Sequence, residues 1–323
     1  MEKKKINYGI IGTGHIGKYH IQQIQNIDWV NLVGVFDIDQ LAAITTENEF
    51  NTLAFKKLED LLSQCDAVSI ATPAFSHYDI GKLALNNMCH IFIEKPITVS
   101  VDTARELINI AENNNLLIQV GHIERFNPAL IDFINNHEQC NPSFIEAHRL
   151  SPFNVRGTDT DVILDLMIHD IDLILYLIKS SIVSIEASGV SILSESLDLV
   201  NARITFKNKA VANLTASRIS DKPLRKLRLF EMNQYVSIDL QKHQYSQYQV
   251  QKDSGALHSN SIFELDNKLV TLKNHQAKKT NALYEELLSF VNSIQNSQKI
   301  AVSGNDGMKA IEVALLIQQK INE

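Results

Sequence analysis

The sequence predicts an α/β protein with an N-terminal domain built on a parallel sheet and a C-terminal α+β domain built on a mixed or antiparallel sheet. Two observations lead to this fold class. From residue 6 to about residue 121, short β-branched runs alternate with helical stretches, which is the order of βαβ units. After residue 127, strand-like runs follow one another across turn-like breaks, so a second and different sheet is expected there.

The first domain is expected to alternate strands and helices from its start. Buried strands separated by helices of this size are typical of a parallel sheet. The expected strands cover residues 6–11, 30–37, 67–73, 90–96 and 116–122, and helical stretches include 16–27 and 99–114.

The second domain is expected to begin after residue 121, which gives domains of 1–121 and 122–323. Its expected strands cover residues 142–151, 181–193, 199–208, 209–220, 224–233 and 235–241, and its helices cover 161–178, 281–295 and 306–321. The last helices are able to pack back on the first domain. The polar stretch 241–274 has the weakest pattern of all and is expected to be the least ordered part.

Composition excludes several classes of partner. The chain has 323 residues, of which 45% are hydrophobic, and its net charge is -7. This charge argues against a general affinity for nucleic acid or anionic membranes, although a local basic pocket could still bind a small anion. We find no signal sequence or membrane span, and the three cysteines fit no zinc or redox spacing, so a cytoplasmic protein with reduced thiols is expected.

A glycine-rich turn predicts a dinucleotide site. Gly12, Gly14 and Gly17 form G-x-G-x-x-G directly after the first strand and directly before a helix. We expect Gly12 to allow the tight turn, Gly14 to let the backbone approach a pyrophosphate, and Gly17 to let the helix lie close to the sheet. A glycine-rich turn without a ligand is the alternative, but it does not explain the acidic residue described next.

Asp37 ends the second expected strand, about 20 residues after the last glycine, where such folds hold the ribose hydroxyls. Its charge would repel a 2′-phosphate. The following Ile38 and Asp39 provide no arginine to neutralise that phosphate, so the sequence favours NAD over NADP.

Lys95 follows the fourth expected strand, at the carboxyl edge of the sheet where ligands of such folds bind. The next residue, Pro96, makes the turn that presents it rigid. A lysine desolvated there could donate a proton or hold a substrate hydroxyl. Without its neighbours, the same residue would be interpreted as a surface lysine.

An Asp and a His lie one helical turn apart in the stretch 161–178. Asp165 and His169 should share a face of an otherwise apolar helix, and a carboxylate beside an imidazole fixes its tautomer and raises its basicity. A purely structural pair is one alternative, and a zinc site is another, although no third ligand stands in an obvious motif. Asp161 is expected to cap this helix and Asp172 to bond another element.

The motifs "GIIGTGHIGKYH", "SIATPAFSH", "FIEKPI", "VGHIERFNP" and "LDLMIHDIDL" resemble, in this order, the Gfo/Idh/MocA family of oxidoreductases. The resemblance implies that the parallel sheet belongs to an N-terminal Rossmann domain and that the C-terminal domain has a large open sheet, whose exposed face forms a homodimer or homotetramer. It also implies a catalytic trio of Lys95, Asp165 and His169. The implied cofactor positions are Gly12, Thr13, Gly14, His15, Ile16, Asp37, Thr72, Pro73, His77, Glu94 and Lys95. Ala74 departs from the family, which often has Asn there.

The stretch from residue 148 to 174 resembles the branch of this family that oxidises the 3-hydroxyl of UDP-N-acetylglucosamine. Arg149, Arg156 and Arg218 could bind the diphosphate of such a substrate, or could be ordinary exposed or ion-paired arginines. The expected reaction is the transfer of hydride from a sugar or nucleotide-sugar hydroxyl to NAD, with His169 or Lys95 as the base. An inositol or aldose dehydrogenase and a non-catalytic NAD-binding regulator are the alternatives.

Overall fold

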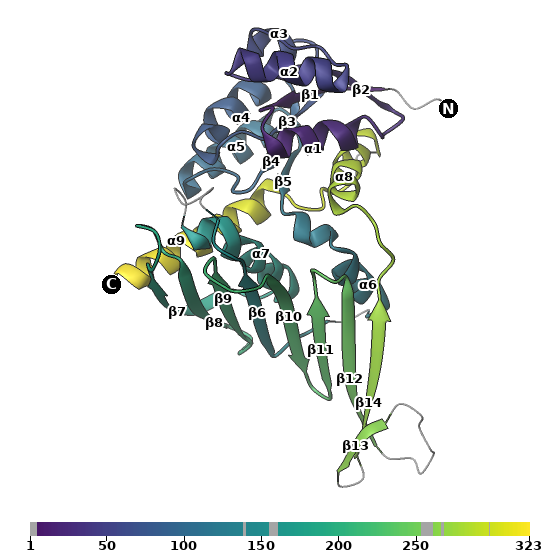
Figure 1. The fold of residues 1–323 in the computed structure, drawn as a ribbon, viewed down its shortest axis with the longest axis vertical. Coiled ribbons are helices and arrows are strands. Elements are labelled where there is room, and N and C mark those ends of the chain that lie inside the picture. Colours follow the sequence, from purple (N-terminus) through teal and green to yellow (C-terminus); the bar gives the residue numbers. More distant parts are fainter. Residues whose placement is uncertain (1–4, 138–139, 155–160, 253–260, 266–267, 297) are drawn as a thin grey trace. The chain divides into compact units, whose positions relative to one another are not determined.

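The computed structural model describes residues 5–137, 140–154, 161–252, 261–265, 268–296 and 298–323 (Figure 1). The chain divides into two compact units. The first unit contains Met1–Ile123 and Asn281–Glu312, and the second contains Glu124–Thr280 and Val313–Glu323.

The first unit is built on a five-stranded parallel sheet with the order β2-β1-β3-β4-β5, which confirms the predicted Rossmann sheet. Its strands are β1 (Ile6–Ile11), β2 (Val30–Phe36), β3 (Ala67–Ile70), β4 (His90–Glu94) and β5 (Ile118–Gly121). Its helices are α1 (His15–Ile24), α2 (Gln40–Phe50), α3 (Leu58–Leu62), α4 (His77–Asn86), α5 (Val101–Asn113) and α8 (Ala282–Asn296), and a short 3₁₀ turn, η1, covers Ala74–Ser76.

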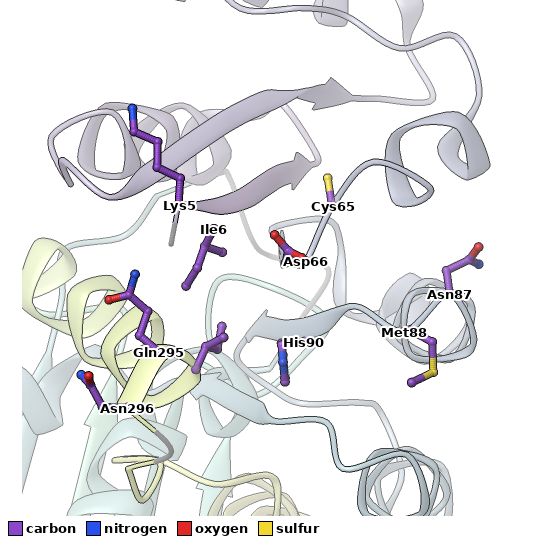
Figure 2. Close-up of a pocket in the computed structure, with 10 residues that line it drawn as sticks. Lys5, Ile6, Cys65, Asp66, Asn87, Met88, His90, Gln295 and Asn296 are labelled. Atoms are coloured by element: carbon purple, nitrogen blue, oxygen red, sulfur yellow. The ribbon is translucent and has the colours of Figure 1, made fainter. Parts of the chain in front are cut away.

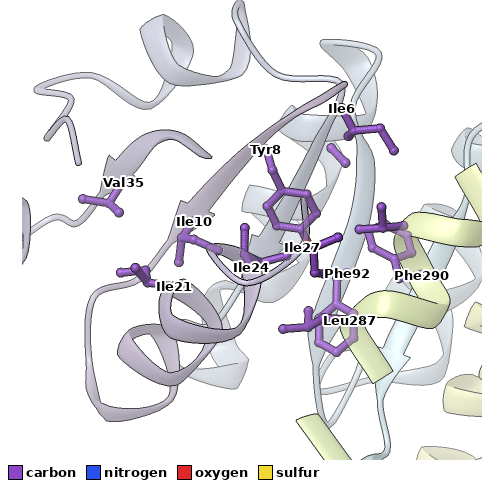
Figure 3. Packing of buried hydrophobic residues seen from close by; sticks show 12 residues of the cluster. Ile6, Tyr8, Ile10, Ile21, Ile24, Ile27, Val35, Phe92, Leu287 and Phe290 are labelled. Atoms are coloured by element: carbon purple, nitrogen blue, oxygen red, sulfur yellow. The ribbon is translucent and has the colours of Figure 1, made fainter. Parts of the chain in front are cut away.

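One face of this sheet packs against α1 and α8, although α8 comes from near the end of the chain (Figure 3). Tyr8 and Phe92 from the sheet surround Phe290 of α8 in edge-to-face contacts, with ring centroids 6.3 Å and 5.9 Å apart. Burying one such ring stabilises the fold by about 1.5–3 kcal/mol. Because these contacts hold α8 on the sheet, the segment Ala282–Asn296 is part of the first unit's core although it lies far from the strands in the sequence.

The second unit is built on a nine-stranded sheet with the order β13-β14-β12-β11-β10-β6-β9-β8-β7. All neighbours pair antiparallel except β6 and β9, so the predicted open mixed sheet is confirmed. The strands with predicted counterparts are β6 (Phe144–Leu150), β7 (Ile182–Val190), β8 (Leu199–Phe206), β9 (Val211–Ser217), β10 (Leu224–Glu231) and β11 (Gln234–Asp239). The helical elements are η2 (Ile123–Phe126), α6 (Pro128–Asn136), η3 (Ile163–Met167) and α7 (Ile168–Leu177), and α9 (Gly304–Asn322) contributes residues to both units.

The expectation of little order in the stretch 241–274 is wrong for its described residues. They form β12 (Gln244–Lys252), β13 (Ser261–Leu265) and β14 (Lys268–Gln276). Tyr245 and Gln247 of β12 alternate inward and are buried, and the Gln247 amide donates to the Gln234 side chain at 2.7 Å. Because a buried glutamine with a partner can occupy a core position, this strand lacks the apolar pattern that sequence reasoning requires.

None of the helices in the described ranges combines the length and the apolar character needed to span a bilayer.

Candidate cofactor and catalytic sites

The glycine turn has the geometry that a bound pyrophosphate requires. Gly12 has a φ of +93°, and a Cβ there would lie 2.7 Å from the carbonyl oxygen of Ala71. A Cβ on Gly17 would lie 1.9 Å from the carbonyl oxygen of Gly12, so only glycine lets α1 approach the turn this closely. A Cβ on Gly14 would meet no atom within 4 Å, because that position faces open space.

The start of α1 is suited to an anion. Gly14 is its N-cap residue, no side chain caps the helix, and its first turn contains no acidic residue. Free N–H groups and the positive end of the helix dipole therefore face the open side of the turn. The cofactor residues expected at its start, His15 and Ile16, are both exposed. These residues fit the phosphates of a dinucleotide.

Asp37 is held beside this turn. One oxygen of its carboxylate accepts hydrogen bonds from the backbone N–H and the hydroxyl of Thr13, at 2.7 Å and 2.9 Å, and the other accepts from the Asp39 N–H at 2.9 Å. Thr13 is buried, so its side chain braces the turn and does not face a cofactor. Ile38 is 93% exposed and leaves the surface beside Asp37 open.

His77 links two loops at the carboxyl edge of the first sheet. Its Nε2 lies 2.8 Å from the carbonyl oxygen of Thr72, and its Nδ1 lies 2.8 Å from that of Pro96. Burial lowers the pKa of His77, although both carbonyl partners and Glu94 act in the opposite direction. Because the ring is buried, His77 positions these loops, and the expected direct contact with a cofactor does not fit its place.

The residues around this link are more accessible. Pro73 is exposed and Thr72 is half-buried, and the Thr72 hydroxyl accepts a hydrogen bond from Ser76 at 2.8 Å. Ala74, which stands where the family often has Asn, starts the short η1 turn. The next residue, Phe75, is exposed, so this turn presents a ring to solvent.

Glu94 and Lys95 lie where the fourth strand ends. Glu94 is the last residue of β4, Lys95 is half-buried, and the peptide between Lys95 and Pro96 is cis. The Glu94 carboxylate lies 2.9 Å from Nε2 of His20, a residue to which the sequence motifs assign no role. A signal was present, because His20 shares the buried face of α1 with Gly17 and Ile24.

The Asp-His helix of the second unit starts with a π-helical turn. The turn η3 contains Asp165, and α7 continues from it with His169 near its start; both residues are half-buried. The Asp161 carboxylate accepts from the backbone N–H groups of Ile163 and Leu164 at 2.9 Å and 3.0 Å, so the predicted cap is confirmed. Single π-helical turns occur frequently at functional sites.

The predicted partner of Asp172 is also present. Arg125 donates two hydrogen bonds to its carboxylate, both 2.7 Å long, and the guanidinium lies 4.2 Å from the ring centroid of Tyr176. The pair holds η2 and α7 together.

The structure does not favour the expected phosphate role of Arg149. This side chain is 3% exposed, donates to Asp170 at 3.0 Å and 2.8 Å, and donates to Glu124 at 2.8 Å. Buried carboxylates therefore satisfy the Arg149 guanidinium, which is the ion-paired alternative.

Arg218 is similarly engaged, because it is buried and donates to Asp198 at 3.0 Å, to Ser196 at 2.7 Å and to the Leu197 carbonyl at 2.8 Å. The third candidate, Arg156, lies outside the described residues.

A further pocket lies elsewhere in the first unit. It has a volume of about 560 Å³ and includes Ile6, Asp66 and His90 at the amino ends of the strands (Figure 2). Burial lowers the pKa of His90 and raises that of the Cys65 thiol, so both are uncharged at neutral pH. Because ligands of this fold bind at the carboxyl ends, this pocket is not the dinucleotide site. Among the residues that the structure describes, no cluster of His, Cys, Asp and Glu is arranged to hold a metal ion.

These features define a Rossmann-type dinucleotide-binding unit joined to a unit with a large mixed sheet. Residues 6–122 match the model of an oxidoreductase family with an NAD-binding Rossmann fold, and residues 140–233 match the C-terminal domain of the same family. The chain belongs to the Gfo/Idh/MocA family, as its motifs predicted. It is therefore an oxidoreductase with an NAD-binding Rossmann fold.

Similarity to individual relatives extends over both units. The chain is 35% identical over 310 residues to the UDP-N-acetylglucosamine 3-dehydrogenase of Acidithiobacillus ferrooxidans, covering 96% of this chain and 95% of that one. A solved structure of that enzyme has a TM-score of 0.89 at 32% identity and covers 98% of each chain. The scyllo-inositol dehydrogenase of Lactobacillus casei, solved with NAD(H) and scyllo-inositol, shares the fold with a TM-score of 0.79, at 21% identity over 99% of this chain and 97% of that one.

Proposed function

We propose that this chain oxidises the 3-hydroxyl of UDP-N-acetylglucosamine with NAD. The observation that supports this most directly is the 35% identity to an enzyme of that name, because the similarity covers 96% of this chain. A similarity confined to the first unit would indicate the cofactor and nothing of the substrate. Here it includes the second unit, which carries Asp165 and His169.

In this proposal, Lys95, Asp165 and His169 provide the protein's part of the chemistry. Bound NAD would supply the hydride acceptor. His169 takes the proton of the hydroxyl that is oxidised, and Asp165 orients His169 or the sugar. Lys95 binds the reacting oxygen and stabilises the negative charge that develops on it, an effect of about 3 kcal/mol by analogy with single oxyanion donors. Lys95 is the alternative base.

The proposed substrate is tested by following NADH absorbance with UDP-N-acetylglucosamine, free N-acetylglucosamine, glucose and myo-inositol. Because NAD oxidation of a sugar hydroxyl is uphill at neutral pH, the keto product should be trapped or passed to an aminotransferase. We expect NAD to be reduced rapidly only when the sugar nucleotide is present, since the nucleotide supplies remote binding energy that aligns the sugar.

Two results would contradict the proposal. Rapid reduction with inositol or an aldose, and none with the sugar nucleotide, would favour a polyol or aldose dehydrogenase. Firm NAD binding without reduction by any of these substrates would favour a non-catalytic regulator.

We also propose that two copies associate through the open face of the nine-stranded sheet. Four half-exposed aromatic residues form a row across the neighbouring strands β6, β10, β11 and β12, each directly opposite the next in the strand register. These residues are Phe144, Phe230, Tyr235 and Tyr248. The centroids of neighbouring rings in this row lie 5.7 Å, 4.8 Å and 5.1 Å apart, so the four rings make a continuous aromatic band. Such a band on a sheet face favours association.

Light scattering coupled to size-exclusion chromatography tests this association. Wild type should elute as a dimer or tetramer, and Tyr235→Glu should shift it toward a monomer. A wild-type monomer, or an unchanged assembly in the variant, would contradict the proposal.

We place the protein in the cytoplasm, since Cys65, Cys89 and Cys140 are all free thiols.

A further inference from the structure

A chain of hydrogen-bonded side chains crosses the apolar face of the first sheet. The Tyr8 hydroxyl lies 2.8 Å from Oγ of Ser69, and Oγ lies 3.0 Å from Nδ1 of His20. Nε2 of His20 lies 2.9 Å from Oε1 of Glu94. The chain connects β1, β3, α1 and β4, and its first three members are completely buried. The phenol of Tyr8 lies in the core shown in Figure 3.

The number of hydrogens fixes the direction of these bonds. Burial raises the pKa of Tyr8, so the phenol keeps its hydrogen and donates it to Ser69. Ser69 then donates its own hydrogen to Nδ1 of His20. A histidine that accepts at Nδ1 carries its hydrogen on Nε2, and this hydrogen reaches Glu94. Every donor therefore points toward the Glu94 carboxylate.

The reverse direction fails in the core. A doubly protonated His20 would donate to Ser69, and Ser69 would donate to Tyr8. The Tyr8 hydrogen would then have no acceptor among the contacts of the described residues, although the whole residue is buried. Because an unsatisfied buried donor is costly, the packing selects neutral His20 with its hydrogen on Nε2.

The chain ends at the carboxyl edge of the sheet. The Glu94 side chain is 20% exposed, and a Cβ on Gly121 would lie 2.9 Å from its Oε2, so the carboxylate lies flat over that glycine. Burial alone would raise the pKa of Glu94, but the His20 bond and the Lys95 charge lower it below its usual value. An ionised carboxylate is thus fixed beside Lys95.

We propose that His20 is a positioning residue for the oxidoreductase reaction: it holds the Glu94 carboxylate and, through it, sets the place of Lys95. The inference rests on the proposed function in so far as Lys95 takes part in that chemistry. The chain is not a route for protons to solvent, because its far end, Tyr8, lies in the core.

The tautomer can be measured without cofactor or substrate. Long-range ¹H–¹⁵N NMR of histidine-labelled protein should show His20 neutral, with its hydrogen on Nε2, at pH 7. Ser69→Ala should change the Nδ1 signal, since that nitrogen loses its donor. A doubly protonated ring, or a hydrogen on Nδ1, would contradict the inference.

The effect of the His20 hydrogen bond on NAD utilisation is measured with two variants, one that keeps a donor for Glu94 and one that loses it. His20→Gln keeps an N–H donor for Glu94, whereas His20→Leu keeps the volume and loses the donor. We expect kcat/KM for NAD to stay within about threefold of wild type in His20→Gln and to fall about 10–100-fold in His20→Leu, the usual effect of removing an outer positioning group. If His20 served packing alone, His20→Leu would keep a higher kcat/KM than His20→Gln, since leucine suits an apolar core better.

The pH dependence of kcat/KM also distinguishes a positioning role of His20 from a role in packing alone. Among the described residues, the titratable groups that interact with the Glu94 carboxylate include His20, Lys95 and His77. Removing the His20 donor should raise the pKa of Glu94, so the acid limb of kcat/KM should move to higher pH in His20→Leu. An unmoved limb would contradict the inference.

His90→Gln is the matched control, because His90 is the first residue of the strand that Glu94 ends. It should change neither NAD binding nor the acid limb. If no sugar substrate is oxidised, the proposed function fails, while the NMR result and the effect of His20→Leu on the NAD dissociation constant still decide the inference.

Discussion

The Arg125 guanidinium binds the Asp172 carboxylate through two parallel hydrogen bonds of 2.7 Å, at a site where both side chains are nearly inaccessible to solvent. Two buried charges in such a geometry stabilise each other, but both have lost their hydration. Removing one partner would therefore leave an unpaired charge in the core, whereas removing both would not.

We predict that Arg125→Met lowers the free energy of unfolding by about 3–5 kcal/mol, the usual effect of leaving a buried charge unpaired. The double variant Arg125→Met, Asp172→Leu should regain most of this loss, because an apolar pair replaces both charges. Urea unfolding at pH 7 measures both values. Losses that simply add in the double variant would show that the pair itself contributes nothing.

The cofactor preference gives a second prediction. Ile38→Arg alone should leave the fold and NAD affinity almost unchanged, because residue 38 is 93% exposed. Asp37→Ala should weaken NAD binding, since it removes the expected ribose acceptor and also the carboxylate that braces Thr13. The two changes together should shift preference toward NADP.

Titration of each variant with both cofactors checks this prediction. A wild type that prefers NADP would remove the role assigned to Asp37. Asp239→Ala is a suitable control, since that carboxylate accepts from the Lys242 N–H in an exposed turn of the second unit.

The proposed chemistry gives a third prediction. Lys95→Ala and His169→Ala should each lower turnover at least about 100-fold, the scale for a lost acid or base, and His169→Ala should leave NAD affinity nearly unchanged. Steady-state kinetics with calorimetric NAD titration measures both quantities. Full activity in either variant would place the chemistry elsewhere.

The sequence predicted those features that depend on local patterns. Apolar periodicity located most strands and helices, and glycine spacing with Asp37 indicated the dinucleotide turn, because the backbone conformation there requires those residues. Asp161 was recognisable as a cap and Asp172 as a bonded residue, since a polar group on an apolar helix needs a partner.

Features that depend on distant partners were not predictable. Arg149 and Arg218 were interpreted as candidates for phosphate binding because a sequence shows a charge and not the carboxylates that neutralise it. The strand that contains Gln247 was missed because its buried glutamine is satisfied by Gln234 of the neighbouring strand. His20 was missed for lack of a visible partner, since Ser69 and Glu94 come from other strands.

The last prediction concerns the buried carboxylate of Asp198 and stability in acid. Its two oxygens accept from the backbone N–H groups of Ile192, Leu193 and Ser194, from the Ser194 hydroxyl, and from Arg218. Burial alone would raise the pKa of Asp198, but the bonds from Ser194 and the backbone lower it well below its usual value. The ionised form is therefore bound more strongly in the folded state than in the unfolded chain.

A group whose pKa is lowered by folding stabilises the protein above its unfolded pKa, about 3.9 for Asp, and loses that contribution as the pH falls toward its folded pKa. Asp198→Asn should therefore lower the midpoint of urea unfolding by a constant amount between pH 7 and pH 5, and the difference from wild type should narrow below about pH 4. Asp239→Asn, which removes the charge of a carboxylate that accepts a single exposed hydrogen bond, should have little effect throughout. If the difference in unfolding midpoint between Asp198→Asn and wild type stayed constant into strong acid, Asp198 would stabilise the fold through packing and not through its charge.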